Sequence, residues 1–328
     1  MTAPDPVEGL PVGARVVVRS RLAEPAGGPS LTDAVGTLVS VDTRSLVVDT
    51  RQGPVTIERS RVVAAKVVPP RPSRRGAPHL ALSVEDLQRV MVEGWAPAER
   101  ARLGDWVLRA AGGFTGRANS VLPLGDPGLP LPDAVARAED WYAARGLPPR
   151  FLVAGPVGFA VGEDRLGALL LDRGYHETNR SVVMTAAAQV VADAGDGAAD
   201  VEVTEALTPR WLDAYARQRE VVPGATESVL TGSPGQLFAS AATGGQVVAV
   251  ARLGLVAGGW AGLYGVWVGP EHRGQGLARA LTGALAARAV ARGTRSLYLQ
   301  TLHANEPAVG LYSSLGFSPH HGYSYLDR

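Results

Sequence analysis

The segment from Val266 to Leu281 constrains the fold of this chain more than any other, because a short apolar strand enters a turn with two glycines and continues directly into a helix. The helix carries Leu277, Leu281 and Leu285 on one face, and Gly293 follows it as a C-terminal glycine. Backbone N–H groups in the first turn of a helix lack an internal partner, and glycine lets a bulky anion approach them. The segment therefore predicts a site for a pyrophosphate that does not require a side-chain cation. A glycine pair before a helix is weak on its own, since many such turns only connect a strand to a helix.

The residues after Gly293 strengthen the signal. A second apolar strand is predicted over 296–302, and a short capped helix follows within His303–Phe317, ending at Gly316. The order strand, R-x-x-G-x-A turn, helix, strand, N-x-x-A-x-x-L-Y-x-x-L-G-F resembles the GCN5-related N-acetyltransferase superfamily over residues 200–328. The resemblance implies an α+β fold of the acyl-CoA N-acyltransferase type. It also implies an enzyme that moves an acetyl group from acetyl-CoA to a primary amine by direct attack in a ternary complex.

The resemblance also implies roles for particular residues. The strand that pairs with the pantetheine arm, the turn that wraps the pyrophosphate and an asparagine beside the arm correspond to Val266, Trp267, Val268, Arg273, Gly274, Gln275, Gly276, Leu277, Ala278, Arg279 and Asn305. Tyr312 corresponds to a tyrosine that protonates the departing thiolate as general acid. The other interpretation of Tyr312 is core packing with a satisfied hydroxyl.

The general base is where the chain departs from the pattern. Relatives carry an acidic residue at positions that here read Gln300 and Leu263-Tyr264-Gly265. Glu220, Glu227 and His303 are the remaining candidates to reach the amine, directly or through water. Each also has a plain interpretation as a solvated loop charge or a strand-end imidazole. Either a water chain removes the proton, or the base comes from elsewhere in the chain.

The N-terminal part predicts a separate small β domain. Five short valine-rich segments alternate with turns between residues 13 and 68, which favours an SH3-like barrel over residues 8–69. This resembles the barrels fused to acetyltransferase domains in actinobacterial proteins, and it offers a surface for a protein partner. A stiff linker with prolines and arginines follows over 70–78. Its arginines are expected to be solvated, and nucleic-acid binding is not expected.

Residues 79–190 predict a second, degenerate copy of the acetyltransferase fold, which makes residues 200–328 the catalytic copy. The segment at Leu124 parallels the one at Val268, and Gly146 parallels Gly293. The intervening loop is shorter and rich in proline, which has no N–H to offer a phosphate, and Leu170 stands where the other copy has Tyr312. This copy is therefore expected neither to hold coenzyme A nor to catalyse.

The degenerate copy contains two candidate substrate residues, Arg117 and Asn119. In one interpretation they satisfy buried backbone groups of a scaffold. In the other they face a cleft between the copies and bind the polar end of the acceptor, since ligand sites favour such junctions. Trp95 and Trp106 are expected in the core.

Composition limits the possible functions. The formal net charge is +1, so no global attraction to nucleic acid or acidic membrane is expected. Cysteine is absent, which removes disulfides and thiol chemistry, and the six histidines do not show the spacing of a metal site. Because no apolar run of membrane-spanning length occurs, a cytoplasmic location is expected. Two functions stay open: an amine acetyltransferase, or a coenzyme A-responsive binding protein with little turnover, which the missing base favours.

Overall fold

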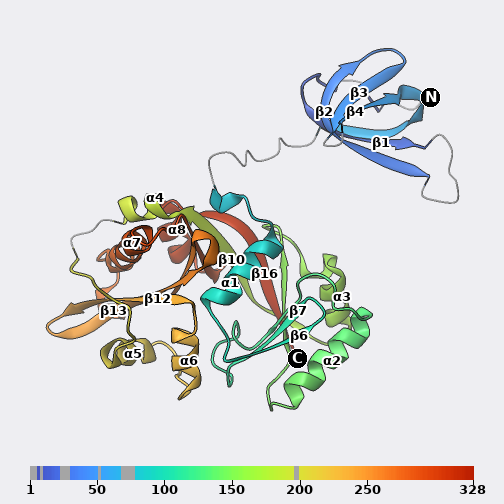
Figure 1. Cartoon of the computed structure of the whole chain (residues 1–328). Coiled ribbons are helices and arrows are strands. Elements are labelled where there is room, and N and C mark those ends of the chain that lie inside the picture. Colours follow the sequence, from blue (N-terminus) through green and yellow to red (C-terminus); the bar gives the residue numbers. More distant parts are fainter. Residues whose placement is uncertain (1–5, 8–9, 23–29, 51–52, 68–77, 196–198) are drawn as a thin grey trace. The chain divides into compact units, whose positions relative to one another are not determined.

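The computed structural model forms two compact units, Met1–Ser73 and Arg74–Arg328. It describes the whole chain except residues 1–5, 8–9, 23–29, 51–52, 68–77 and 196–198, which are drawn as a grey trace in Figure 1. The expected linker at 70–78 lies outside the described residues, apart from Pro78.

The N-terminal unit is a five-stranded antiparallel sheet, as the sequence predicted. Its strands are β1 (Arg15–Arg21), β2 (Leu31–Val41), β3 (Ser45–Thr50), β4 (Gly53–Glu58) and β5 (Val62–Val67), in the spatial order β4-β3-β2-β1-β5. Alternation places Val16 and Val18 inward, where they are fully buried. The first residue pairs of β2 include the polar residues Thr32 and Asp33, which lie opposite Ser20 and Arg19 of β1. There Arg19 forms an ion pair with Asp33 at 2.7 Å.

The larger unit is built on one eleven-stranded sheet of order β11-β12-β13-β14-β15-β10-β16-β9-β8-β7-β6. The strands are β6 (Glu99–Leu103), β7 (Trp106–Ala110), β8 (Val121–Leu122), β9 (Arg150–Gly155), β10 (His176–Ala187), β11 (Glu202–Thr204), β12 (Gly235–Thr243), β13 (Gln246–Val256), β14 (Trp260–Val268), β15 (Ser296–Leu302) and β16 (Ser318–Asp327). The helices are α1 (Val84–Gly94), α2 (Leu131–Ala143), α3 (Arg165–Asp172), α4 (Ala188–Ala194), α5 (Pro209–Ala216), α6 (Ala225–Thr231), α7 (Leu277–Val290) and α8 (Glu306–Ser314).

This unit contains the same succession of elements twice. The order β6-β7-β8-α2-β9-α3-β10 is repeated as β12-β13-β14-α7-β15-α8-β16, and β8–β9 and β14–β15 are the two parallel pairs. The last strand of each repeat lies in the other half of the sheet: β10 pairs with β15, and β16 pairs with β9. The two repeats therefore share one sheet and one compact unit. The sequence analysis did not predict this exchange of strands.

The helices cover the sheet in three groups. On one face α4, α7 and α8 pack over the β13–β15 region, with Leu281 and Leu285 fully buried as the helical pattern predicted, and Leu277 partly buried. A second core joins α2 and α3 to β7–β9, and these helices lie away from α7 and α8 in Figure 1. A third core joins α1, α5 and α6 to strands from both repeats. It contains Trp95, whereas Trp106 lies in the second core.

Arg252 on β13 closes this third core and is fully buried. Its guanidinium donates to the Leu230 carbonyl at the end of α6, to the Gly94 carbonyl at the end of α1, and to the Ser233 hydroxyl. Burial lowers the pKa of Arg252 to about 10, so the group is still charged at neutral pH. One side chain thus satisfies the C-terminal carbonyls of two helices, which have no partner within their own helices.

Candidate active site

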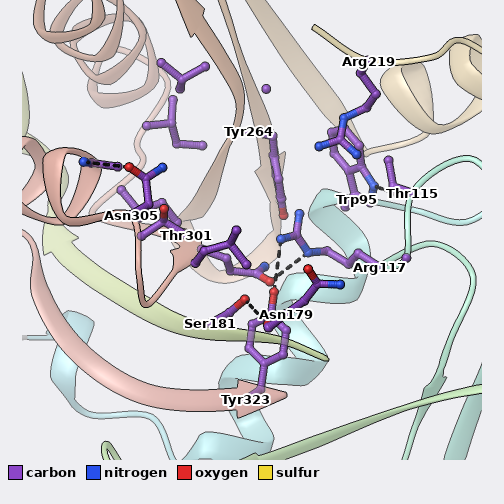
Figure 2. A pocket seen from close by; sticks show the side chains of 18 of the residues that line it. Trp95, Thr115, Arg117, Asn179, Ser181, Arg219, Tyr264, Thr301, Asn305 and Tyr323 are labelled. Atoms are coloured by element: carbon purple, nitrogen blue, oxygen red, sulfur yellow. Dashed lines mark hydrogen bonds between the residues drawn. The ribbon is translucent and has the colours of Figure 1, made fainter. Parts of the chain in front are cut away.

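A cavity opens where two parallel strands of the second repeat separate. Strands β14 and β15 pair only from Trp260–Leu263 and Ser296–Leu299. Beyond this point Tyr264–Val266 and Gln300–Leu302 line opposite sides of a cavity of about 420 Å³ (Figure 2). The first repeat contributes Arg117 and its neighbours to the same cavity. The site is therefore a joint product of both repeats.

A bulge in β14 shapes one wall of the cavity. The register with β13 shifts between Val250 and Arg252, so that Gly265 and Val266 both lie opposite a single residue of the partner strand. Gly265 has φ +59°, and a Cβ there would stand 3.0 Å from a ring carbon of Tyr215. Glycine is required because its backbone is left-handed and because the tyrosine is close. The bulge interrupts the ladder and presents this backbone to the cavity.

The glycine turn after β14 is open to solvent. Gly274 and Gly276 have φ +76° and +79°, and a Cβ at either would meet no atom within 4 Å. Helix α7 begins immediately after Gly276. Within the described residues, the backbone N–H groups of residues 274–277 make no hydrogen bond to the protein. The turn thus has the free donors that the sequence predicted for an anion.

The polar side chains of this turn contact neighbouring groups of the protein. Arg273 and Gln275 fold back onto the carbonyls of Val268 and Glu271, each at 3.4 Å. Arg279 donates to the carbonyl of Ala194 and to the hydroxyl of Ser314. Of the remaining residues expected to bind the cofactor, the partly buried ones are Val266, Trp267, Val268, Leu277 and Ala278. The donors of this turn without a partner in the described protein are therefore backbone N–H groups and the remaining N–H groups of the exposed Arg273 guanidinium.

Asn305 and Tyr312 both line the cavity from α8. Asn305 begins the helix, where its side-chain oxygen accepts from the N–H of Ala308 at 3.3 Å. Tyr312 is 7% exposed and packs edge-on against Phe317, with ring centroids 5.8 Å apart. Its hydroxyl makes no hydrogen bond to another described residue. Burial raises the pKa of Tyr312, so its hydroxyl is protonated at neutral pH.

Arg117 reaches the cavity from the loop after β7, whereas Asn119 does not line it (Figure 2). The Nε of Arg117 donates to Gln300 Oε1 at 2.8 Å, and its Nη2 approaches the hydroxyl of Tyr323 at 3.5 Å. Asn119 is buried and makes four hydrogen bonds to the backbone of its own loop. These contacts agree with the interpretation in which Asn119 satisfies buried backbone groups of a scaffold.

None of the expected candidates for a general base lines the cavity. Glu220, Glu227 and His303 are exposed and do not line it. Glu227 instead accepts from the N–H of Gly224 at 2.8 Å and stabilises the start of α6. Among the described residues that line the cavity, the ionisable ones are arginines and tyrosines, with no carboxylate or imidazole.

Sequence reasoning missed several lining residues, namely Asn179, Ser181, Tyr215 and Tyr323. Asn179 lies where the register of β10 with β16 breaks, between Thr178 and Ser181, and has φ +50°. Asparagine is one of the few residues that tolerate this left-handed conformation. Its presence was the one local feature of the sequence that could have indicated an irregular backbone here. Strands β10 and β16 reach the cavity only because the two repeats exchange them.

In the first repeat, the turn equivalent to the glycine turn is already filled. The carboxylate of Asp105 accepts from the N–H of Asp126 at 3.1 Å, and the carboxylate of Asp126 accepts from the N–H of Gly128 at 2.8 Å. A Cβ at Gly125 would stand 2.7 Å from an Asp105 oxygen. Helix α2 then starts at a proline-containing turn. Two carboxylates thus occupy the donors that an anion would need.

The described part of the chain contains neither a metal-binding cluster nor a membrane-spanning helix. No group of three or more His, Asp or Glu side chains there is arranged to hold a metal ion. No described helix is both long and apolar enough to cross a membrane.

The fold and the cavity define an acyl-CoA N-acyltransferase of the GCN5-related class, and solved structures share this fold. A GCN5-related N-acetyltransferase from Kribbella flavida has 17% sequence identity and a TM-score of 0.55, covering 75% of this chain and 96% of its own. A tandem GNAT protein from the clavulanic acid biosynthesis pathway has 16% identity and a TM-score of 0.52, covering 74% of this chain and 87% of its own.

Sequence comparison then gives the family. The model described as Rv0428c N-terminal Sm-like domain matches residues 10–66, and the one described as probable histone acetyltransferase Rv0428c C-terminal matches residues 83–326. The chain is 32% identical to the probable histone acetyltransferase Rv0428c of Mycobacterium tuberculosis, over 96% of this chain and 95% of that protein. It is 27% identical to the uncharacterized N-acetyltransferase YobR of Bacillus subtilis, over 72% of this chain and 95% of that protein. The chain belongs to the Rv0428c acetyltransferase family, and it is an acetyltransferase.

Proposed function

We propose that the chain binds one acetyl-CoA in the repeat at 200–328 and transfers its acetyl group to a primary amine in a ternary complex. The observation that carries this is the cavity at the divergence of β14 and β15. The glycine turn with free N–H groups follows at the end of β14, and Tyr312 lines the cavity.

The residues present fit the cosubstrate. The pyrophosphate would bind the N–H groups of residues 274–278, since no Cβ fills this space and the helix dipole of α7 favours an anion. The pantetheine arm would lie along Val266–Val268 and beside Asn305. When bound, acetyl-CoA supplies an acetyl group activated as a thioester. Val266 and Asn305 line the cavity into which that thioester would enter.

The groups around the cavity support the following proposed steps of transfer. The acceptor amine enters from the Arg117 side and forms the new bond between nitrogen and the acetyl carbon. Backbone N–H groups at the Gly265 bulge would stabilise the negative charge that develops on the carbonyl oxygen. Tyr312 donates its proton to the sulfur as the bond between carbon and sulfur breaks. The amine passes its proton to water, because the described lining residues offer no base. A proton from this water then returns to the Tyr312 oxygen and restores the phenol.

The repeat at 79–190 would contribute to the acceptor side and bind no second coenzyme A. Its own turn is occupied by Asp105 and Asp126, and Leu170 replaces the tyrosine. It still places Arg117 in the shared cavity. In this proposal the repeat at 200–328 binds the cofactor, and the repeat at 79–190 lines the side of the cavity that binds the acceptor.

Gly276→Val tests the cofactor site. The added side chain would project into open space that the pyrophosphate needs, so binding of acetyl-CoA is expected to weaken at least tenfold, or about 1.4 kcal/mol. Isothermal titration calorimetry measures this directly.

The matched control is Gly293→Val at the other end of α7. Gly293 has φ +83° and also no atom within 4 Å of a Cβ, so both variants suffer similar backbone strain. Affinity is expected to fall in the Gly276 variant only. Unchanged affinity in a folded Gly276→Val protein would remove the assignment.

A further inference from the structure

The acceptor side of the cavity gathers positive charge. The cavity is lined by three arginines, Arg117, Arg150 and Arg219. No Asp or Glu is among its described lining residues. Arg150 is neutralised, because its guanidinium forms a two-point ion pair with the carboxylate of Asp327. Arg219 is exposed at the cavity, where solvent screens its charge.

Arg117 has no counter-charge among the described residues. It is half-buried, and its partners are neutral: the amide oxygen of Gln300, the hydroxyl of Tyr323 and the ring of Tyr264, whose centroid lies 5.5 Å from the guanidinium carbon. Its Nη1 makes no hydrogen bond to a described residue. The buried Arg252 also lies 5.5 Å from the Tyr264 ring and bonds only to neutral groups. Two unneutralised guanidinium groups therefore adjoin one ring, which favours an anion nearby.

Gln300 adds an unmatched donor beside Arg117. A guanidinium only donates, so the amide oxygen of Gln300 must face Arg117, and its Nε2 must point elsewhere. This Nε2 is buried and has no hydrogen-bond partner in the described part of the protein. An unmatched buried donor is unfavourable. An oxygen of a bound group could therefore stabilise this side of the site.

We propose that the acceptor is a small amine that also carries an anionic oxygen group, a carboxylate or a phosphate, bound by Arg117 with Gln300. This rests on the proposed function, since it names the acceptor class for the same cavity. The anion would neutralise Arg117 and supply acceptor atoms for the free donors, and charge-assisted bonds of this kind are the strong ones. A lysine-rich peptide would instead bring like charge toward Arg117.

The experiment compares acceptors that differ only in the anionic group. Thiol release from acetyl-CoA is measured with amino acids against their amides, with aminoalkyl phosphates against the corresponding amino alcohols, and with a lysine-rich peptide. The two pairs distinguish a carboxylate from a phosphate. We expect kcat/KM to be at least about tenfold higher for the charged member of one pair, because charge-assisted hydrogen bonds are stronger than neutral ones. Calorimetric binding of the same pairs to the protein saturated with coenzyme A gives a second readout.

Variants then assign the preference to Arg117. Arg117→Met is expected to reduce the charged-to-neutral ratio to about one while leaving the KM for acetyl-CoA little changed, and Arg117→Lys is expected to retain part of it. Arg145→Met is the control, because Arg145 pairs with Glu99 and does not line the cavity, yet the variant changes the net charge equally. A merely structural role for Arg117 would lower activity toward both members of a pair alike.

The outcomes separate this inference from the proposed function. Turnover with neutral amines or with the lysine-rich peptide equal to or above that with charged amines overturns the inference and leaves acetyl transfer intact. A ratio unchanged in Arg117→Met also overturns it. If no amine is turned over, equal binding of charged and neutral members overturns the inference, whereas loss of acetyl-CoA binding itself would contradict the proposed function.

Discussion

Tyr312→Phe is expected to lower kcat by roughly 10²-fold, with the KM for acetyl-CoA little changed, because a lost general acid affects the transition state rather than the bound ground state. Tyr312 lines the cavity, and burial raises its pKa so that its hydroxyl stays protonated. Phenylalanine keeps the edge-on packing against Phe317 and removes only the proton donor. Steady-state thiol release at saturating acetyl-CoA measures the effect.

Tyr142→Phe is the matched control for this prediction. Tyr142 is fully buried, and its hydroxyl donates to the carbonyl of Arg109 at 2.8 Å, outside the cavity. Its variant is expected to lose stability with normal kcat per folded molecule. The same behaviour in Tyr312→Phe would place Tyr312 in the core and reject it as the acid.

Arg252→Leu is expected to lower the free energy of unfolding of the larger unit by about 2–4 kcal/mol. The variant leaves the carbonyls of Gly94 and Leu230 and the hydroxyl of Ser233 without their donor, and each buried group left unmatched costs about 1–3 kcal/mol. Removing a buried charge returns part of this loss. Denaturant unfolding followed by tryptophan fluorescence is suited to the measurement, because all six tryptophans lie in the larger unit.

Arg89→Leu provides the comparison, since Arg89 forms an exposed ion pair with Glu85 within α1 and such pairs contribute about 0–1 kcal/mol. A loss in Arg252→Leu no greater than this would show that the three hydrogen bonds do not hold α1 and α6 in place.

The parts of the site that the sequence predicted are those whose chemistry is local. Free N–H groups at a helix start are a local feature, and Gly274 and Gly276 lie two residues apart just before the helix, so this turn could be predicted from the sequence directly. The absence of a base was visible at Gln300. The sequence also showed two copies of the same succession of elements.

The exchange of β10 and β16 could not be predicted, because strand pairing between distant segments leaves no mark on the local pattern of either strand. The lining residues Asn179, Ser181 and Tyr323 were missed for this reason. The occupied turn of the first repeat shows the same limit. Prolines in the loop indicated the loss of donors, but Asp105 comes from the β6–β7 hairpin, and only the fold brings it there.

Calorimetric titration of the full chain with acetyl-CoA tests the central claim most directly, since one repeat is proposed to hold the cofactor and the other to face the acceptor. We expect a stoichiometry near one per chain, with the binding lost or weakened at least tenfold in Gly276→Val. A stoichiometry near two, or a single site that survives unchanged in Gly276→Val, would contradict it.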